Sequence, residues 1–504
     1  MADYPHQPAL PEADSRWPQE ERRKVLVVCP DFSPSTWIGI LNPPVALHAS
    51  WQIDLRVVTE RSRVGRRADW PDVVVFNRNC DPRHVKWHER LLDVGTPCIY
   101  ELDDNFFESP RGSSLERSFG TSAQIACLRR YLQAAALVRV YSSTLRERVA
   151  ALNPHTAQVV AAVEYQEARE PSRDPSAPLK IVYPTSRAPD ERCELFVPAV
   201  SRVLDRYRGQ VEMHFLGYGP RELRHHPHVR FHRFHMDYLA FLRDFARAGY
   251  DIGLAPLVDD PFHRSKTNNK FREFGACRIA GIYSNIDVYS SCVTDGETGL
   301  LVNDRPEEWY HAIVRLVEDH ALRRAIQARA RSYVEVHYAP SDAQATWLRQ
   351  IDEVRRRSPE AVARIGADTA RRTTDAPQRT TTAAVIPQIA RDRLSRWRAG
   401  LAHLRERASE CGGWWNLSER AFRARAYTLR MRVRIPLLLY RARKTPPRAV
   451  PRPEASRPKV LPPCDALSSQ ARDDASPLAV VGTVAARFSD RFVGLQSSPP
   501  PSKS

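Results

Sequence analysis

The chain has 504 residues, enough for two or three domains, and its 42% hydrophobic and 27% charged residues are typical of a globular protein. The formal net charge of +17 is misleading as an average, because residues 358–504 hold 27 Lys and Arg against 12 Asp and Glu. The rest of the chain is nearly neutral. No apolar run approaches the roughly 20 residues that a bilayer crossing needs, which excludes a membrane-spanning protein.

The cysteines and the N-terminus indicate a compartment. Nine cysteines are dispersed along the chain with no C-x-x-C pair and no Cys/His spacing of a metal site. An odd, scattered set of this kind is typical of reduced thiols in a cytoplasmic enzyme. The N-terminus is acidic and contains proline, so we expect no signal peptide there.

Continuous apolar runs, the pattern of strands buried on both faces, recur along the first part of the chain. They occupy residues 24–29, 55–59, 73–76, 98–102 and 137–141. Helical or loop segments separate the runs, and this alternation predicts a doubly wound parallel sheet. We expect a Rossmann-like domain over residues 23–168, after a disordered N-terminus at 1–22.

A second series of strands follows a polar, proline-containing linker at 169–178. Its runs occupy residues 180–183, 211–216, 229–231, 252–257 and 279–283. They predict a second Rossmann-like domain over 179–340, and a helix over 341–357 follows it after Pro340. The predicted fold class is therefore α/β, with two tandem Rossmann-like domains and a cleft between them.

The most informative stretch is residues 251–302. The spacing of Lys266, Lys270 and Glu273 predicts two cations and one carboxylate on the same face of a helix that opens near Lys266. At the carboxyl edge of a parallel sheet, such a group suits a phosphorylated ligand that bears hydroxyls. A solvated helix face is the alternative explanation.

Three motifs in this part of the chain carry a resemblance: EFGAC around Glu273, DGETGLLV at 295–302 and the helical segment 309–331. They resemble the donor-binding half of the retaining GT-B glycosyltransferases of family 4, or group 1. Glu273 matches the second acid of the family signature, while Ser265 stands where the first acid is expected. The "SK…KFRE" version of the helix is similar to a subgroup common in polysaccharide biosynthesis clusters. The resemblance covers about residues 24–357.

The resemblance implies a nucleotide-diphosphate sugar as donor, retention of configuration, and no metal or other cofactor. It implies that Arg187 and Arg192 clamp the diphosphate, where a surface turn is the alternative. It also implies that Glu273 holds the ribose, that Lys266 stabilises the leaving group, and that Lys270 binds the donor or only pairs with Glu273. Gly217 and Gly219 would allow close approach to the nucleotide, or simply end a strand.

Acceptor-side candidates follow strands of the first domain. Asp103 and Asp104 end an apolar run, and such a pair can hold a divalent metal or cap the strand end. The resemblance implies instead that they face the acceptor and orient or deprotonate its hydroxyl. Arg78 also matches the subgroup and is expected to point to the cleft or to pair with the Asp103–Asp104 loop.

The basic C-terminal region, 358–504, is predicted to be of low complexity, with an amphipathic helix at 388–407. Trp and Tyr among arginines over 388–444 suit an anionic membrane surface, and plain disorder is the alternative. No nucleic-acid-binding motif accompanies the basic residues. We therefore expect a cytoplasmic protein with a possible peripheral attachment to membranes.

The predicted function is transfer of a sugar from a nucleotide-diphosphate sugar to a hydroxyl of a glycan, lipid-linked or small-molecule acceptor. Two alternatives remain open at this point. A sugar-nucleotide epimerase of the same fold would use the same donor site with water in the cleft. A non-catalytic sugar-nucleotide-binding protein would keep the fold without turnover.

Overall fold

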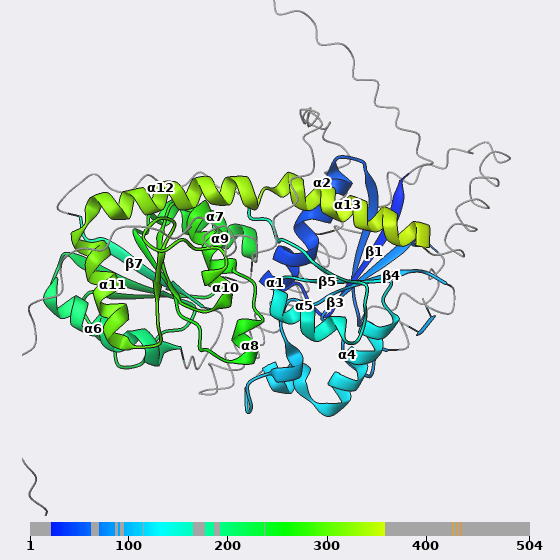
Figure 1. Ribbon diagram of the computed structural model, residues 1–504, viewed down its shortest axis with the longest axis horizontal. Helices are drawn as coiled ribbons and strands as arrows, with labels where there is room; N and C mark the ends of the chain where they lie inside the picture. The colour runs from blue at the N-terminus through cyan, green and yellow to red at the C-terminus, as the bar shows by residue number, and fades with distance from the viewer. Residues whose placement is uncertain are drawn as a thin grey trace, which may run out of the picture. The chain divides into compact units, whose positions relative to one another are not determined.

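The computed structural model describes residues 22–61, 70–85, 89–90, 95–113, 115–164, 177–185, 192–235 and 237–357, together with Tyr427, Met431 and Ile435. Within these residues the chain forms two six-stranded sheets, and every strand pair is parallel. Figure 1 shows helices around each sheet. The predicted pair of Rossmann-like sheets, the GT-B fold, is confirmed. Most of the predicted linker, 169–178, lies outside the described residues.

The first sheet has the strand order β2-β1-β3-β4-β5-β6. Its strands are β1 (Arg23–Cys29), β2 (Ile53–Thr59), β3 (Val73–Asn77), β4 (Cys98–Glu101), β5 (Leu137–Val140) and β6 (Thr156–Gln158). The first five agree with the sequence prediction to within two residues. The prediction missed β6, because this three-residue edge strand reads Thr-Ala-Gln and only its first residue is buried.

The second sheet has the strand order β12-β11-β10-β7-β8-β9. Its strands are β7 (Leu179–Pro184), β8 (Val211–Leu216), β9 (Val229–His232), β10 (Ile252–Ala255), β11 (Ala280–Ser284) and β12 (Leu300–Val302). β10 ends two residues before the predicted Leu257, because Pro256 has no N–H to continue the ladder. The central strands β10 and β11 are buried throughout, which explains why their sequences are apolar without alternation.

Helices cover the sheets and connect the strands. The first half contains α1 (Pro34–Thr36), η2 (Trp37–Leu41), α2 (Asn42–Ala49), η3 (Phe106–Glu108), η4 (Glu116–Gly120), α4 (Ser122–Ala134) and α5 (Ser143–Ala150). The second half contains α6 (Cys193–Arg206), α7 (Tyr238–Ala248), α8 (Pro261–Arg264), α9 (Asn269–Ala276), α10 (Asp287–Ser290), α11 (Pro306–Glu318), α12 (His320–His337) and α13 (Pro340–Arg357).

Helix α13 returns the chain to the first sheet, where it lies beside α2 (Figure 1). Arg23 of β1 donates two hydrogen bonds of 2.8 Å to the carboxylate of Asp352. The guanidinium of Arg139, on β5, lies 3.7 Å from the centroid of the buried Trp347 ring. Side chains of α13 are therefore part of the first sheet's core, although the chain has passed through the whole second sheet in between.

Three residues of the C-terminal region lie within the described part of the chain. Tyr427, Met431 and Ile435 are helical and four positions apart, so they share one face. Met431 and Ile435 are 1% and 2% exposed and belong to the hydrophobic core. This part of the segment predicted to meet lipid thus packs inside the protein, while the predicted helix at 388–407 lies outside the described residues. No helix in the described ranges has the length and apolar composition for a bilayer crossing.

Candidate active site

Both sheets have a point where the strand order reverses, and ligands of open parallel sheets bind beyond the carboxyl ends of the strands at such points. In the second sheet this point lies between β7 and β10, and in the first between β1 and β3. A cavity of about 810 Å³ is lined by the segments that follow these four strands. Its acidic and basic lining residues are Arg78, Asp103 and Asp104 from the first half, and Arg192, His232, Arg233, His235, Asp244, Lys266, Lys270 and Glu273 from the second.

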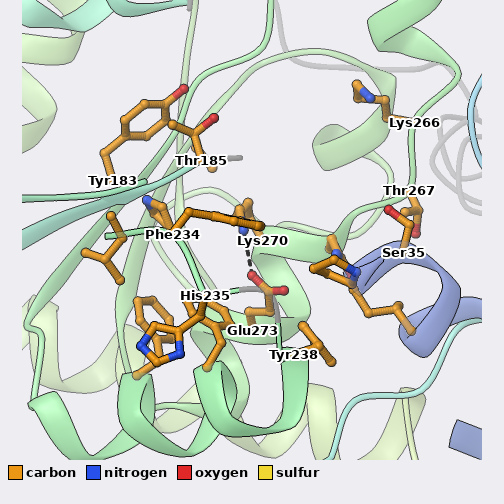
Figure 2. A pocket seen from close by; sticks show the side chains of 18 of the residues that line it. Ser35, Tyr183, Thr185, Phe234, His235, Tyr238, Lys266, Thr267, Lys270 and Glu273 are labelled. Atoms are coloured by element: carbon orange, nitrogen blue, oxygen red, sulfur yellow. Dashed lines mark hydrogen bonds and ion pairs between the residues drawn. The ribbon is translucent and has the colours of Figure 1, made fainter. Parts of the chain in front are cut away.

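Glu273 lies on α9 at the floor of this cavity. Its side chain is 2% exposed, and its Oε2 accepts a 2.7 Å hydrogen bond from Lys270 Nζ, one turn away on the same helix. Tyr238 also lines the cavity, and burial first, and then the nearby Glu273 carboxylate, raise the pKa of Tyr238 well above its usual value. Figure 2 shows the three side chains together. The buried carboxylate of Glu273 is thus held by Lys270 through one oxygen.

Lys266 does not share a helical face with Lys270, which corrects the sequence prediction. The helix begins at Asn269, and Lys266 lies in the break between α8 and α9. The short helix α8 before it begins at Pro261 and ends at Arg264. Asp260 caps α8 by accepting a 2.7 Å hydrogen bond from the His263 backbone N–H. Lys266 Nζ reaches Asp104 of the first half at 2.7 Å. In Figure 2 it lies apart from the Lys270–Glu273 pair.

Ser265, which occupies the position of the expected first acid, is fully buried between the two halves. Its hydroxyl donates to Pro261 O at 2.8 Å, and Asn105 Nδ2 donates to Ser265 Oγ at 3.3 Å. Ser142 Oγ donates to the Ser265 carbonyl at 2.8 Å. A small neutral side chain fits these contacts, so this position joins the halves in this chain.

The acceptor-side candidates form one charge network. Arg78 follows β3 with a positive φ of 56°, and its guanidinium donates to both oxygens of Asp103, with Nε at 2.5 Å. The same guanidinium lies 3.2 Å from Asp104. Burial alone lowers the pKa of Arg78, but the two carboxylates outweigh burial and raise it above its usual value. Asp103 therefore has both oxygens engaged by Arg78, while Asp104 is shared between Arg78 and Lys266.

Arg192 lies at the N-terminus of α6, where positive charge and the helix end both favour an anion. Its Nη2 donates to Thr185 Oγ1 at 2.8 Å, and Thr185 also lines the cavity. The predicted second member of the clamp, Arg187, lies outside the described residues. The structure therefore places one of the two arginines at the cavity wall.

The two glycines after β8 have packing roles instead of facing the cavity. Gly217 has a φ of 99°, and a Cβ there would lie 2.0 Å from the carbonyl oxygen of Thr185. A Cβ on Gly219 would lie 2.5 Å from the Phe231 ring. Because these spaces are filled by protein atoms, the strand-ending turn explains both glycines better than close approach to a nucleotide.

An aromatic wall of the cavity was not anticipated from the sequence. It follows β9 and continues along α7, and its members are His232, Phe234, His235, Tyr238, Phe241, Phe245 and Tyr250. Some of these rings also pack on one another; Phe241 and Phe245 stack with centroids 5.2 Å apart. The position after a parallel strand was an available signal, because ligands of open parallel sheets bind beyond the carboxyl ends of the strands.

One further group of titratable residues lies outside this cavity. Ligand-type atoms of Glu60, Asp81 and His84 lie within 4.8 Å of one another. Asp81 accepts a 2.6 Å hydrogen bond from Arg83, and Glu60 accepts one of 3.0 Å from Asn79. These carboxylates therefore have protein partners, and we assign them no function.

Glu60→Gln is expected to stabilise the protein in a pH-dependent way. Burial first, and then the nearby Asp81, raise the pKa of Glu60 from 4.5 to about 7. The folded wild type therefore keeps a proton that the unfolded chain releases, and it loses stability as pH rises from about 4.5 to 7. The variant avoids this loss, roughly 3 kcal/mol at most. Thermal unfolding should show equal midpoints at pH 4.5 and a higher midpoint for the variant above pH 7. A difference that is constant over this range would contradict the expectation.

Comparison with protein families gives one match. Residues 179–319 match the family described as "Glycosyl transferases group 1". The match spans the second sheet and includes Arg192, Lys266, Lys270 and Glu273. The residues that this half contributes to the cavity therefore lie within the matched segment. No curated protein matches the chain significantly.

Solved structures give several distant likenesses. HepE from Anabaena, in complex with UDP and glucose, is 12% identical with a TM-score of 0.49, and the match covers 66% of this chain and 100% of HepE. Sucrose-phosphate synthase from Thermosynechococcus elongatus is 14% identical with a TM-score of 0.47, covering 66% and 100%. The pneumococcal O-GlcNAc transferase GtfA, in complex with UDP and GlcNAc, is 12% identical with a TM-score of 0.40, covering 56% of each chain. Identities of this size say nothing of this chain's substrate.

Proposed function

We propose that this protein, whose residues 179–319 match the group 1 glycosyltransferases, transfers a sugar from a nucleotide-diphosphate sugar to a hydroxyl with retention of configuration. The observation that carries the proposal is a single cavity with anion-binding cations and a buried carboxylate on one side and a carboxylate pair on the other. Its volume of about 810 Å³ suits a ligand the size of a nucleotide sugar.

The donor is proposed to bind against the second sheet. Glu273, oriented by Lys270, would accept hydrogen bonds from the two ribose hydroxyls. Arg192 and Lys266, with Arg187 as the sequence predicts, would neutralise the diphosphate. These cations act most strongly as the sugar–phosphate bond lengthens, because negative charge then builds up on the leaving group inside a partly buried site.

The acceptor is proposed to bind against the first half. Asp104 is the better placed of the two acids to accept a hydrogen bond from the reacting hydroxyl, since Arg78 engages both oxygens of Asp103 but only Oδ2 of Asp104, whose Oδ1 is paired with the flexible Lys266. Arg78 then acts as a positioning residue that fixes the loop. The proposed reaction uses no metal: the charge of the leaving diphosphate is met by arginine and lysine.

The acceptor class is proposed from the sequence resemblance to the subgroup of polysaccharide biosynthesis clusters. A growing glycan or a lipid-linked sugar would present the hydroxyl. The basic segment 388–444 would support the second possibility by holding the enzyme at an anionic membrane. Because Met431 and Ile435 are buried, any lipid contact would have to come from other residues of that segment.

A thermal-shift screen against UDP-, GDP-, ADP- and TDP-sugars tests the proposal. We expect one nucleotide to raise the unfolding midpoint of the wild type, by several degrees at a ligand concentration far above its Kd. Arg192→Ala should abolish most of this shift. Glu194→Ala, which removes a charged side chain two residues further along α6, is the matched control and should keep the shift.

Stabilisation by no nucleotide, or equal stabilisation of wild type and Arg192→Ala, would contradict the proposed donor site. Release of free nucleotide only when an acceptor is present would distinguish a transferase from the alternatives. An epimerase would interconvert the donor without acceptor, and a binding protein would leave the donor unchanged.

A further inference from the structure

A buried ion pair joins the two sides of the cavity. Lys266 Nζ lies 2.7 Å from Asp104 Oδ1, and the two side chains are only 14% and 11% exposed. Arg78 donates to both acids of the loop, to Asp103 at 2.5 Å and to Asp104 at 3.2 Å. The charges of Arg78, Lys266, Asp103 and Asp104 sum to zero. An anion bound beside Lys266 would therefore give the network a net negative charge.

The second lysine of the cavity is paired in a different way. Lys270 and Glu273 are three residues apart on α9, so their ion pair depends on one helix turn only. Lys266 and Asp104 are 162 residues apart and belong to opposite sides of the cavity. Of these two pairs, only Lys266–Asp104 connects the donor side of the cavity to the acceptor side. Only a change in this pair can therefore alter the acceptor side when a donor binds.

We propose that Asp104 and the diphosphate of the sugar donor are alternative partners of Lys266, so that donor binding takes the lysine away and frees the carboxylate for the acceptor hydroxyl. This inference rests on the proposed function. It makes Lys266 a link between the two substrates as well as a donor contact.

The side chains present suit such an exchange. Lysine carries its charge on a flexible four-carbon stem, so Nζ can change partner without a backbone shift. The ammonium also lies 4.4 Å from the centroid of the Phe262 ring, a contact with the second half that does not involve Asp104. Breaking a buried ion pair normally leaves one charge unpaired. Here Arg78, which lies 3.2 Å from Asp104, would still pair with that carboxylate after the lysine leaves.

The exchange has a consequence for substrate order. While Lys266 is bound to Asp104, its ammonium occupies the side of Oδ1 where an acceptor hydroxyl would donate. Once the lysine turns to the diphosphate, that oxygen can accept the hydroxyl proton in a hydrogen bond. Donor binding should therefore precede productive acceptor binding.

The test measures the Kd of the nucleoside diphosphate selected by the thermal-shift screen, by calorimetry, for four proteins. These are the wild type, Asp104→Asn, Lys266→Met and the double variant. If Asp104 competes for Lys266, Asp104→Asn should tighten binding about tenfold, a coupling of ordinary size. Lys266→Met should weaken binding about tenfold. In the double variant, loss of Asp104 should have no further effect, because the contested lysine is gone.

Two comparisons separate the exchange from a general effect of charge. Asp244, which also lines the cavity, is not bonded to Lys266, and Asp244→Asn should change Kd less than about twofold. Tightening that survives in the double variant, or an Asp104→Asn protein that binds more weakly, would overturn the proposal. Should Lys266→Met fail to fold by circular dichroism, Lys266→Gln replaces it. A wild type that binds no nucleotide would instead refute the proposed function itself.

Discussion

Glu273→Ala is expected to raise the Kd of the nucleoside diphosphate about 100-fold. Removing a carboxylate that accepts two hydrogen bonds from ligand hydroxyls weakens the binding free energy by roughly 3 kcal/mol. This loss corresponds to about two orders of magnitude in Kd. The Glu273 side chain is 2% exposed and held by Lys270, so it is oriented before the ligand arrives. Calorimetry on the wild type and the variant measures the change directly.

A ligand change tests whether the ribose is the partner. In the wild type, the 2′-deoxy form of the same nucleotide should bind more weakly, because one hydroxyl contact is missing. In Glu273→Ala, the normal and the 2′-deoxy forms should bind equally. Lys270→Met is the matched protein control, since it removes the ion-pair partner and leaves the carboxylate. If the deoxy form loses the same affinity in both proteins, Glu273 does not hold the ribose.

The strands could be predicted well because burial alone determines their sequences. The run from Lys24 to Cys29 is apolar at nearly every position because β1 is central and covered on both faces. β6 is an edge strand whose pairing with β5 comes from the backbone, so its polar side chains carry no signal. The predicted bounds of the helix near the cavity were less accurate, because tertiary contacts determine where it begins and no local sequence pattern shows those contacts.

The candidate site was predictable in its residue types but not in its pairings. Asp104 and Glu273 were both expected at the cleft, because each follows a predicted strand of a parallel sheet. Both residues line the cavity. Helical spacing then wrongly placed Lys266 beside Glu273. The signal for the break was present, since Asp260 and Pro261 form a helix start five residues earlier. What no local pattern shows is that Ser265 is bonded to the first half of the molecule, which fixes Lys266 next to Asp104.

Lys266→Met is expected to lower kcat about 10²–10³-fold, the usual effect of removing one group that stabilises charge in a transition state. The loss in kcat should exceed the roughly tenfold loss in nucleotide affinity, because the charge on the leaving diphosphate is larger in the transition state than in the bound donor. Single-turnover kinetics at saturating donor separates the two effects.

Lys270→Met is the comparison within the same cavity. Its lysine is paired to Glu273 at 2.7 Å, so we expect a smaller loss in kcat, about tenfold, and part of that through a less well-held Glu273. Equal losses for the two lysines would mean that the cavity stabilises the leaving group by its overall potential. A loss for Lys266→Met that appears only in the affinity would mean that Lys266 binds the donor equally in the ground state and the transition state. Another cation would then stabilise the leaving diphosphate, and among the described residues Arg192 is the first candidate.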